Sequence, residues 1–308
     1  MRQRILPVLV FLLAALLLPP LALGKFPALS LPSFAPQSAD EEDLGWIGES
    51  APSSQASQAE EVMLPADNPL DITEFKILNT ATGQVETVSV RDYVRGAVAA
   101  ELPATFHAEA MKAQAVAAHT WALHCALTQR ENPDPALKGA DFSADPDHLK
   151  GYARAEDIKA TYGNMADEYW DKITTAADSV MDYVLLYDGK PIQAVYHSCS
   201  IGVTESAENV WQASVPYLVP VESEGDLVAP AAEAEVTFTS AEMRALLTAA
   251  FDGLVLGDNP ALWLSPVSYT ESGYIMDIKV GNLTVTGKEV RAALDLRSAS
   301  FAISYDSA

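Results

Sequence analysis

The chain has 308 residues, 49% of them hydrophobic, and a formal net charge of −23. This length allows one large domain or two small ones, even when a non-globular N-terminus is set aside. The acidic balance argues against nucleic acid as a partner, because phosphates would repel the chain, and against adsorption onto anionic lipid. Two cysteines, Cys125 and Cys199, are too few for a disulfide framework. One disulfide between them is an alternative, but two buried thiols are the better interpretation.

The first 24 residues combine a basic start with a long apolar run. Two arginines precede an uncharged stretch, residues 5–23, that only prolines interrupt. The pattern fits a signal peptide, with Ala-Leu-Gly at 22–24 as the cleavage site. It equally fits a membrane anchor, since about 20 apolar residues span a bilayer. Both alternatives place the rest of the chain outside the cytoplasm, secreted or anchored.

Residues 25–70 are rich in Pro, Ser, Ala, Gln and acidic side chains. Such a segment buries too little apolar surface to offset the entropy of ordering, so we predict a disordered linker. Order begins near Asp71. Two β-rich stretches, 74–78 and 84–88, flank an Asn-Thr-Ala-Thr-Gly turn and predict a hairpin.

A helix ending at Glu101 is predicted next. Ser89, followed by an acid three residues later, is a typical N-cap. Pro103 disfavours helical geometry in the residue before it, so the helix should stop at the glutamate. The apolar stripe of one helical face continues onto Glu101. The residues of this stripe are Tyr93, Val94, Ala97 and Val98.

Glu101 is therefore a candidate general acid. A carboxyl that closes an apolar stripe at a helix C-terminus meets desolvation and the negative end of the helix dipole, and both raise its pKa. A proton held near neutral pH is what a general acid needs. The simpler alternative is a glutamate that frays into water at a helix end.

A second helix is predicted to begin with Thr105 as its cap. Between residues 113 and 129 it has many alanines and no acidic residue, Lys or Arg. A helix that is apolar nearly all round should be central and surrounded. Its polar exceptions are Lys112, Gln114, His119 and His124. A single histidine in such a helix is usually a satisfied core residue, so His119 alone is a weak signal.

Residues 132–152 predict an irregular loop long enough to have a function. Parts of 154–182 should be helical. A clear hairpin follows, with arms at 184–187 and 192–197 around an Asp-Gly turn.

The second arm of this hairpin leads into a loop that gathers hydroxyls, amides, carboxylates and one tryptophan. Planar aromatic faces meet sugar C–H groups, and polar groups reach sugar hydroxyls, so the loop indicates a carbohydrate-binding surface. The competing interpretation is a capped turn with a core tryptophan. The residues concerned are His197, Ser198, Ser200, Thr204, Glu205 and Trp211.

The remaining chain predicts an acidic linker, then helices and strands without a βαβ rhythm. The expected elements are a linker at 222–235, helices at 240–247 and 287–294, and strands at 267–270, 274–280, 283–286 and 301–303. An α+β fold is therefore predicted, with mixed helices and antiparallel hairpins around the central Ala-rich helix. We expect a single catalytic domain over residues 71–308.

Three groups of motifs occur in order along the chain. The first is Tyr-Val-Arg-Gly-Ala-Val-Ala-Ala-Glu-Leu-Pro at 93–103, continued through 109–123; the second covers 194–198, 204–211 and 215–218; the third covers 285–287 and 294–298. Together they resemble the stage II sporulation protein D family, whose domain is also called SpoIID/LytB. The resemblance covers about residues 72–304.

The resemblance implies a lytic transglycosylase that cuts peptide-stripped glycan strands of peptidoglycan to 1,6-anhydromuramyl ends. Glu101 matches the family's catalytic glutamate. One carboxyl suffices here: it protonates the glycosidic oxygen, then takes the proton of the sugar's own 6-hydroxyl, whereas ordinary glycosidases use two carboxylates. The chemistry needs no cofactor. Lys112 matches a lysine that supports the active site in the family. The candidate substrate-binding residues are Lys112, His119, Tyr196, His197, Ser198, Ser200, Thr204, Glu205 and Trp211.

The chain departs from the family pattern at three places. His119 stands where the family usually has Arg, and it is shorter and charged only part of the time, so activity could be weaker or more pH-dependent. Residues 141–149 keep one His but lack two Cys, and one His cannot complete a zinc shell, so no metal site is expected. Ser-Ile-Gly at 200–202 replaces the usual Ser-Gly-Gly, which can reshape the loop.

Two functions of different classes follow. One is the glycan lyase, which the retention of Glu101 and Lys112 favours. The other is a non-catalytic peptidoglycan binder that stimulates a cell-wall amidase, which His119 and the loop changes favour. A third alternative, a secreted structural domain, would leave the occurrence of Glu101 together with the His197 loop unexplained. By resemblance, the partners are glycan strands and a membrane-bound cell-wall amidase, and the process is engulfment during sporulation.

Overall fold

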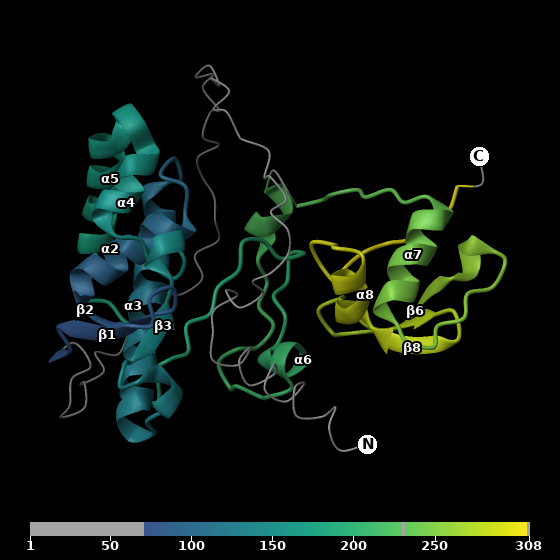
Figure 1. The fold of residues 1–308 in the computed structure, drawn as a ribbon, viewed down its shortest axis with the longest axis horizontal. Coiled ribbons are helices and arrows are strands. Elements are labelled where there is room, and N and C mark those ends of the chain that lie inside the picture. Colours follow the sequence, from purple (N-terminus) through teal and green to yellow (C-terminus); the bar gives the residue numbers. More distant parts are fainter. Residues whose placement is uncertain (1–70, 230–231, 307–308) are drawn as a thin grey trace, which may run out of the picture. The chain divides into compact units, whose positions relative to one another are not determined.

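The computed structural model describes residues 71–229 and 232–306. The predicted leader or anchor at 1–24 and the predicted linker at 25–70 lie outside the described residues. Within them, none of the helices has the length and apolar character needed to cross a membrane. The chain divides between Tyr196 and His197 into two compact units, here called the N-terminal and C-terminal units (Figure 1). Each is described by itself.

The N-terminal unit begins with the predicted hairpin. Strands β1 (Glu74–Asn79) and β2 (Val85–Ser89) pair antiparallel, with Glu74 opposite Ser89. A third strand, β3 (Phe142–Ala144), joins β1 in parallel and gives the sheet order β2-β1-β3. The irregular loop predicted at 132–152 thus contains a strand, as well as two 3₁₀ turns, η2 (Pro135–Leu137) and η3 (Pro146–His148). Three residues are too few for an alternation pattern, and the pairing comes from β1.

Helix α2 (Val90–Glu101) has both predicted ends. The Ser89 side chain accepts a hydrogen bond from the Asp92 backbone N–H at 3.0 Å. Leu102 is extended, with φ −118° and ψ 136°, so helical geometry ends at Glu101 as the following proline requires.

Helix α3 (Ala108–Glu131) begins later than predicted. Its N-cap is His107, whose Nδ1 accepts from the Glu109 N–H at 3.2 Å. Thr105 instead lies in a turn closed by the Phe106 N–H on the Pro103 carbonyl. The prediction of Thr105 as the cap was wrong because this turn lengthens the connection between the two helices.

Helical structure predicted within 154–182 is present as α4 (Ala155–Tyr162), the 3₁₀ turn η4 (Gly163–Met165) and α5 (Ala166–Asp178). The hairpin that follows is much shorter than predicted: only β4 (Leu186–Tyr187) and β5 (Lys190–Pro191) pair. Its Asp-Gly turn has both residues at positive φ, 49° and 72°, as a two-residue hairpin loop requires. Pro191 has no N–H to donate to the ladder, and residues 192–197 form no strand.

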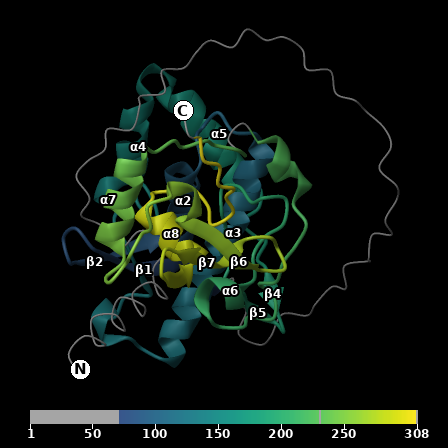
Figure 2. The same cartoon turned by 90° about the vertical axis from the view of Figure 1, so that its right-hand side faces the viewer.

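The core of the N-terminal unit surrounds α3, as the alanine-rich sequence predicts. Helices α2 and α5 both pack on α3, and α2 also packs on the sheet (Figures 1 and 2). Met111, Ala122 and Leu123 of α3 have no exposed surface. At the sheet, Phe75, Tyr93 and Phe142 make edge-to-face ring contacts with centroids 5.1–5.5 Å apart.

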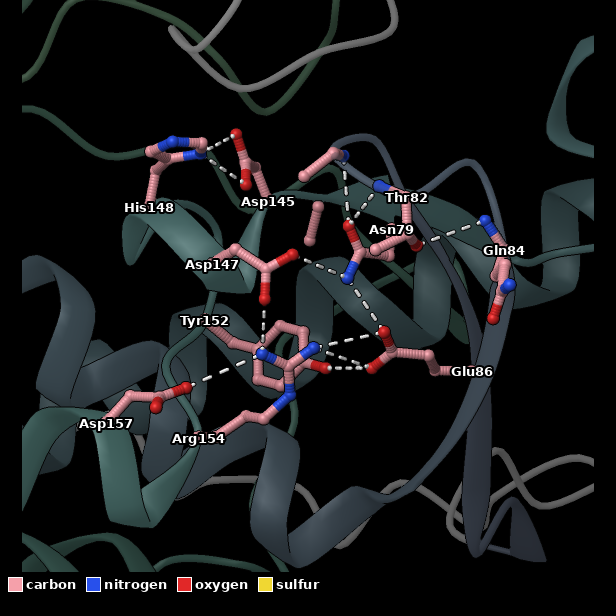
Figure 3. A network of polar contacts seen from close by, with 12 residues as sticks. Asn79, Thr82, Gln84, Glu86, Asp145, Asp147, His148, Tyr152, Arg154 and Asp157 are labelled. Carbon is pink, nitrogen blue, oxygen red and sulfur yellow. Dashed lines mark hydrogen bonds and ion pairs between the residues drawn. The ribbon is translucent and has the colours of Figure 1, made fainter.

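A polar network holds the chain segment that enters α4 (Figure 3). Arg154, the residue before α4, donates to Glu86 of β2 at 3.0 Å and to Asp147 of η3 at 2.7 Å. Asn79 Nδ2 joins the same two carboxylates at 2.7 and 3.2 Å. The network therefore ties β1, β2 and η3 to the segment 152–154, and this segment packs against α2.

The contact between that segment and α2 is made at Gly96. The Ala153 N–H donates to the Gly96 carbonyl at 3.0 Å. A Cβ added to Gly96 would lie 2.2 Å from the Ala153 carbonyl oxygen. Only glycine allows the backbones to approach this closely.

The C-terminal unit contains an antiparallel sheet with the order β6-β7-β8 and a helical layer on one face. Its elements are α6 (Ala207–Trp211), η5 (Glu224–Val228), α7 (Ser240–Ala250), η6 (Pro260–Leu262), β6 (Leu264–Tyr269), β7 (Ile275–Val280), β8 (Leu283–Thr286) and α8 (Gly287–Ala293). Leu247 of α7 and Val290 of α8 are fully buried with Ile278 of β7.

The α+β class is confirmed. The strand predicted at 301–303 does not form; near it, the Ile275 N–H donates to the Ala299 carbonyl. Three residues with a single apolar alternation are too few to form a strand without a partner strand to pair with.

Replacing Gly96 with alanine should destabilise the N-terminal unit by about 1–3 kcal/mol or more, because the new methyl group meets backbone rather than a flexible side chain. Thermal or urea unfolding of the variant measures this. Gly257→Ala is the matched control, since a Cβ there meets nothing within 4 Å and should change stability little. Equal stability of both variants would contradict the close contact at Gly96.

Candidate functional site

Glu101 lies at the C-terminal end of α2, where the residue as a whole is exposed to solvent. Its carboxyl is nevertheless surrounded by enough protein to be desolvated, and this raises its pKa. A hydrogen bond with Tyr196 acts in the opposite direction without cancelling the rise. Exposure is a property of the whole residue, whereas desolvation acts on the carboxyl group alone. Glu101 is thus accessible to a ligand and inclined to keep its proton, which are the two properties of a general acid.

Tyr196 is the partner of Glu101. The residue is 45% exposed. Burial of its hydroxyl, followed by the charge of Glu101, raises the pKa of the phenol well above its usual range. The hydroxyl therefore stays neutral near pH 7 and donates to the Glu101 carboxylate. Tyr196 and Glu101 are separate candidates in the sequence, and the structure brings them together.

His119 is buried, with 3% of its surface exposed. Burial lowers its pKa to about 4, although the nearby Asp182 raises it, so the ring is neutral near pH 7. Its Nδ1 has no hydrogen-bond partner among the described residues. In this conformation His119 lies beneath the surface rather than on it, and the charge of the family's arginine is absent here.

Lys112, on the first turns of α3, pairs with Glu109 rather than with Glu101. Its Nζ lies 2.7 Å from Glu109 Oε1. The ammonium sits three residues from its partner on an exposed helix face, where such pairs contribute little stability. Lys112 thus supplies positive charge near the start of α3.

In the C-terminal unit, Asp226 organises the start of the predicted binding loop. Its Oδ2 accepts from the Ser200 N–H at 2.8 Å and lies 3.5 Å from His197 Nε2. A hydrogen bond from the Ser200 side chain is the main cause of the lowered pKa of this carboxyl, and the Ser200 backbone N–H lowers it further. The sequence around Asp226 predicts an acidic linker, so this role of Asp226 does not follow from the sequence. No local pattern signals a residue that acts through contacts 26 positions away.

Several other predicted loop residues hold the loop itself. Thr204 Oγ1 accepts from the Val221 N–H at 2.9 Å. Glu205 Oε1 accepts from the Ser206 N–H at 2.7 Å and from Asn209 Nδ2 at 2.9 Å. These contacts favour the capped-turn interpretation for both residues. By contrast, the loop residues with substantial exposure are His197, Ser198 and Trp211, the last being 37% exposed.

Trp211 ends the short helix α6, and Lys288 of α8 holds that end. The Lys288 ammonium donates to the carbonyls of Asn209 and Val210, the latter at 2.7 Å. These are carbonyls of the last helical turn, where a cation is favoured. Lys288 is a second positioning residue whose role does not follow from the sequence pattern.

Both cysteines are free thiols, as expected from the sequence, but each is half-buried rather than buried. Burial raises the pKa of Cys125 to about 12. Cys199 Sγ donates to the Asp226 and Ser200 carbonyls, each at 3.4 Å.

An exposed, desolvated glutamate paired with a neutral tyrosine defines a candidate acid–base site on an α+β scaffold. The sequence profile of the family described as SpoIID: Stage II sporulation protein matches residues 78–187, which include Glu101, Lys112 and His119. The chain is 32% identical to Stage II sporulation protein D of Bacillus subtilis (strain 168) over 73% of this chain and 63% of that protein. It is 29% identical to Stage II sporulation protein D of Bacillus amyloliquefaciens over 76% and 65%, respectively.

A shorter match joins the chain to the Amidase enhancer of Bacillus subtilis (strain 168), at 32% identity over 41% of this chain and 14% of that protein. Residues 78–187 thus match the SpoIID family, and the resemblance of the chain to the stage II sporulation protein D family is confirmed. The chain spans less than two thirds of the length of both sporulation proteins it matches.

Replacing Asp226 with alanine should loosen the loop at Ser200. The buried Ser200 N–H would lose its acceptor, which costs about 1–3 kcal/mol. Cys199 should then react faster with a thiol reagent, while Cys125, whose thiol pKa is raised to about 12, serves as the slowly reacting internal reference. Asp226→Asn keeps a side-chain oxygen as acceptor and should behave more like the unaltered chain. An unchanged Cys199 rate in Asp226→Ala would show that Asp226 does not hold the loop.

Proposed function

We propose that the chain is a peptidoglycan lytic transglycosylase with a role in remodelling the cell wall during sporulation. The substrate is glycan stripped of its stem peptides, and the product carries a 1,6-anhydromuramyl end. The observation that supports this most is the state of Glu101, an accessible carboxyl whose pKa burial raises, at the end of the helix within the matched family region.

In the first step, protonated Glu101 gives its proton to the glycosidic oxygen as the bond to the anomeric carbon breaks. Positive charge develops on the sugar ring, and Glu101 becomes a carboxylate. Tyr196 stabilises that carboxylate, because its hydroxyl donates a hydrogen bond to it. The leaving glycan keeps the proton.

In the second step, the sugar's own 6-hydroxyl attacks the anomeric carbon and Glu101 takes its proton. The acid is thereby regenerated, and no water is consumed. A second carboxylate is not required, because the nucleophile belongs to the substrate. The exposed residues His197, Ser198 and Trp211 are proposed to bind the glycan strand, through hydrogen bonds and ring contacts with the sugars.

A second function is supported by the match to an Amidase enhancer. In this alternative the chain binds peptidoglycan without cutting it and stimulates a cell-wall amidase. Either function acts on the cell wall, so we propose that the folded part lies outside the cytoplasm. Residues 1–24 would serve as a cleaved leader or retained anchor. For the first function, the same amidase would be the partner that strips peptides.

Glu101→Gln should abolish glycan cleavage, with a loss of at least about 10²-fold, because an amide cannot deliver the proton. The chain and its variant are incubated with peptide-free glycan strands, and the products are weighed by mass spectrometry. Anhydro-ended fragments are about 18 Da lighter than hydrolytic ones, since one water fewer is added.

The matched control is Glu156→Gln, which removes an exposed carboxylate in the first turn of α4 and should leave cleavage unchanged. Strands that stay intact with the unaltered chain, but remain bound to it, would rule out the lyase. The amidase enhancer would then be tested by adding a cell-wall amidase.

The pH dependence of kcat/KM should follow protonated Glu101. Since burial raises this pKa, activity should persist above pH about 4.3, where an ordinary glutamate has lost half its protons. It should decline as the pH rises through the Glu101 pKa. Initial rates on peptide-free glycan between pH 4 and 9 measure this. A midpoint at or below the ordinary glutamate value would show that the carboxyl is not held protonated.

A further inference from the structure

The connection between α2 and α3, residues 102–107, has a fixed backbone that the mechanism above does not use. The Phe106 N–H donates to the Pro103 carbonyl at 3.0 Å and closes a turn. From α5, the Lys172 ammonium donates to the Ala104 carbonyl at 3.0 Å. Ala104 is buried, with 5% of its surface exposed. The turn is therefore held both from within and from a second helix, and the side chains that it presents have defined places.

Three consecutive residues of this connection are exposed: Thr105, Phe106 and His107. Phe106 is 46% exposed, and its ring makes no ring contact within the described part of the chain. Rings in the core of the same unit pair with each other, as Phe75 and Phe142 do with centroids 5.5 Å apart. A single exposed phenylalanine is common on protein surfaces, so its exposure alone indicates no ligand. The inference needs its neighbours and its distance from the candidate acid.

The neighbours of Phe106 suit a ligand with hydroxyl groups. Thr105 has a hydroxyl that can donate and accept. His107 Nδ1 accepts from the Glu109 N–H at 3.2 Å, so a neutral ring has its proton on Nε2 and can donate from there. No acidic side chain lies between Glu101 and Glu109 in the sequence. The connection itself therefore offers no carboxylate to a metal ion or an amine, and it fits a polyhydroxylated ligand.

Phe106 lies close to the candidate acid along the chain. Consecutive Cα atoms are about 3.8 Å apart and a closed turn spans less than about 7 Å, so the Cα atoms of Glu101 and Phe106 lie within about 15 Å of each other. Both residues belong to the N-terminal unit, so this limit does not depend on the other unit. A polymer of sugar rings bound at Glu101 can therefore extend over Phe106.

We propose that Phe106 is a sugar-binding residue: one face of its ring receives the C–H face of a sugar in the glycan strand, while Thr105 and His107 bond to the hydroxyls of that sugar. The contact removes apolar surface of both rings from water, and the sugar C–H groups meet the negative face of the aromatic ring. This inference rests on the proposed function, because the ligand is the strand whose glycosidic bond Glu101 protonates.

The loop at 197–211 meets the same criterion less well. There, Thr204 and Glu205 use their side chains to hold the backbone of the loop itself. In the connection after α2, the backbone is held by its own turn and by Lys172, which leaves the Phe106 ring available to a ligand.

The test measures binding of peptide-free glycan strands by isothermal titration calorimetry. All chains contain Glu101→Gln, so the strands stay intact during the titration. Phe106→Ala should weaken binding about tenfold, which corresponds to about 1.4 kcal/mol. Phe106→Leu should weaken it nearly as much, because leucine is apolar but has no flat ring face. Phe106→Trp should bind at least as tightly as the Glu101→Gln chain, since its ring face is larger.

His107→Ser keeps a helix-capping oxygen and removes the ring donor, so it should weaken binding less, by about two- to fivefold. Tyr269→Leu is the matched control: Tyr269 of β6 is 57% exposed and lies in the C-terminal unit, and its replacement should leave glycan binding unchanged. Thermal unfolding of every variant should match that of the Glu101→Gln chain, because the replaced side chains are exposed.

Equal binding by Phe106→Ala, Phe106→Leu and the Glu101→Gln chain would overturn the proposal. So would binding that Phe106→Leu retains and Phe106→Ala loses, since that pattern indicates apolar contact without a role for the ring face. A Glu101→Gln chain that binds no glycan would overturn it as well. The lyase is judged separately, by the products of the chain with Glu101 intact, so failure of one proposal is not mistaken for failure of the other.

Discussion

The close packing of α2 within the N-terminal unit is the constraint on which the candidate site depends. Gly96 lets the backbone at Ala153 come within reach of a hydrogen bond, and the Arg154 network holds that segment from the other side. The direction of α2 is thereby fixed, and with it the place where Glu101 emerges. A helix that ended elsewhere would leave the same carboxyl in water, with an ordinary pKa and no use as an acid.

The protonation of Glu101 follows from two opposing effects of that position. Desolvation by the surrounding protein disfavours the charge, whereas the Tyr196 hydroxyl favours it. A carboxyl that serves in turn as acid and base needs both, because one effect alone would lock it in a single state. The exposure of Tyr196 and Glu101 keeps this balance accessible to a ligand.

Short-range sequence signals, such as helix caps, prolines and alanine content, predicted the parts of the structure that neighbouring residues determine. The Ser89 cap and Pro103 fix both ends of α2, and the alanine content of α3 predicts its central place. The prediction of Thr105 as a cap failed because a turn after Pro103 lengthens the connection. Strand β3 was missed because its pairing with β1 spans about 65 residues. Asp226 and Lys288 were missed for the same reason, since each acts on a distant backbone.

The polar residues of α3 show where sequence patterning reaches its limit. In an alanine-rich helix His119 and Gln114 look alike, as polar exceptions on a buried surface. The structure separates them by their electrostatic effects: the charge of Asp182 raises the pKa of His119 against the larger effect of burial, whereas the Gln114 side chain lowers the pKa of Tyr196. Each leaves one nitrogen unpaired among the described residues, at a cost that an apolar side chain would avoid. Such a cost is expected where selection acts on the chemistry of a site rather than on stability alone.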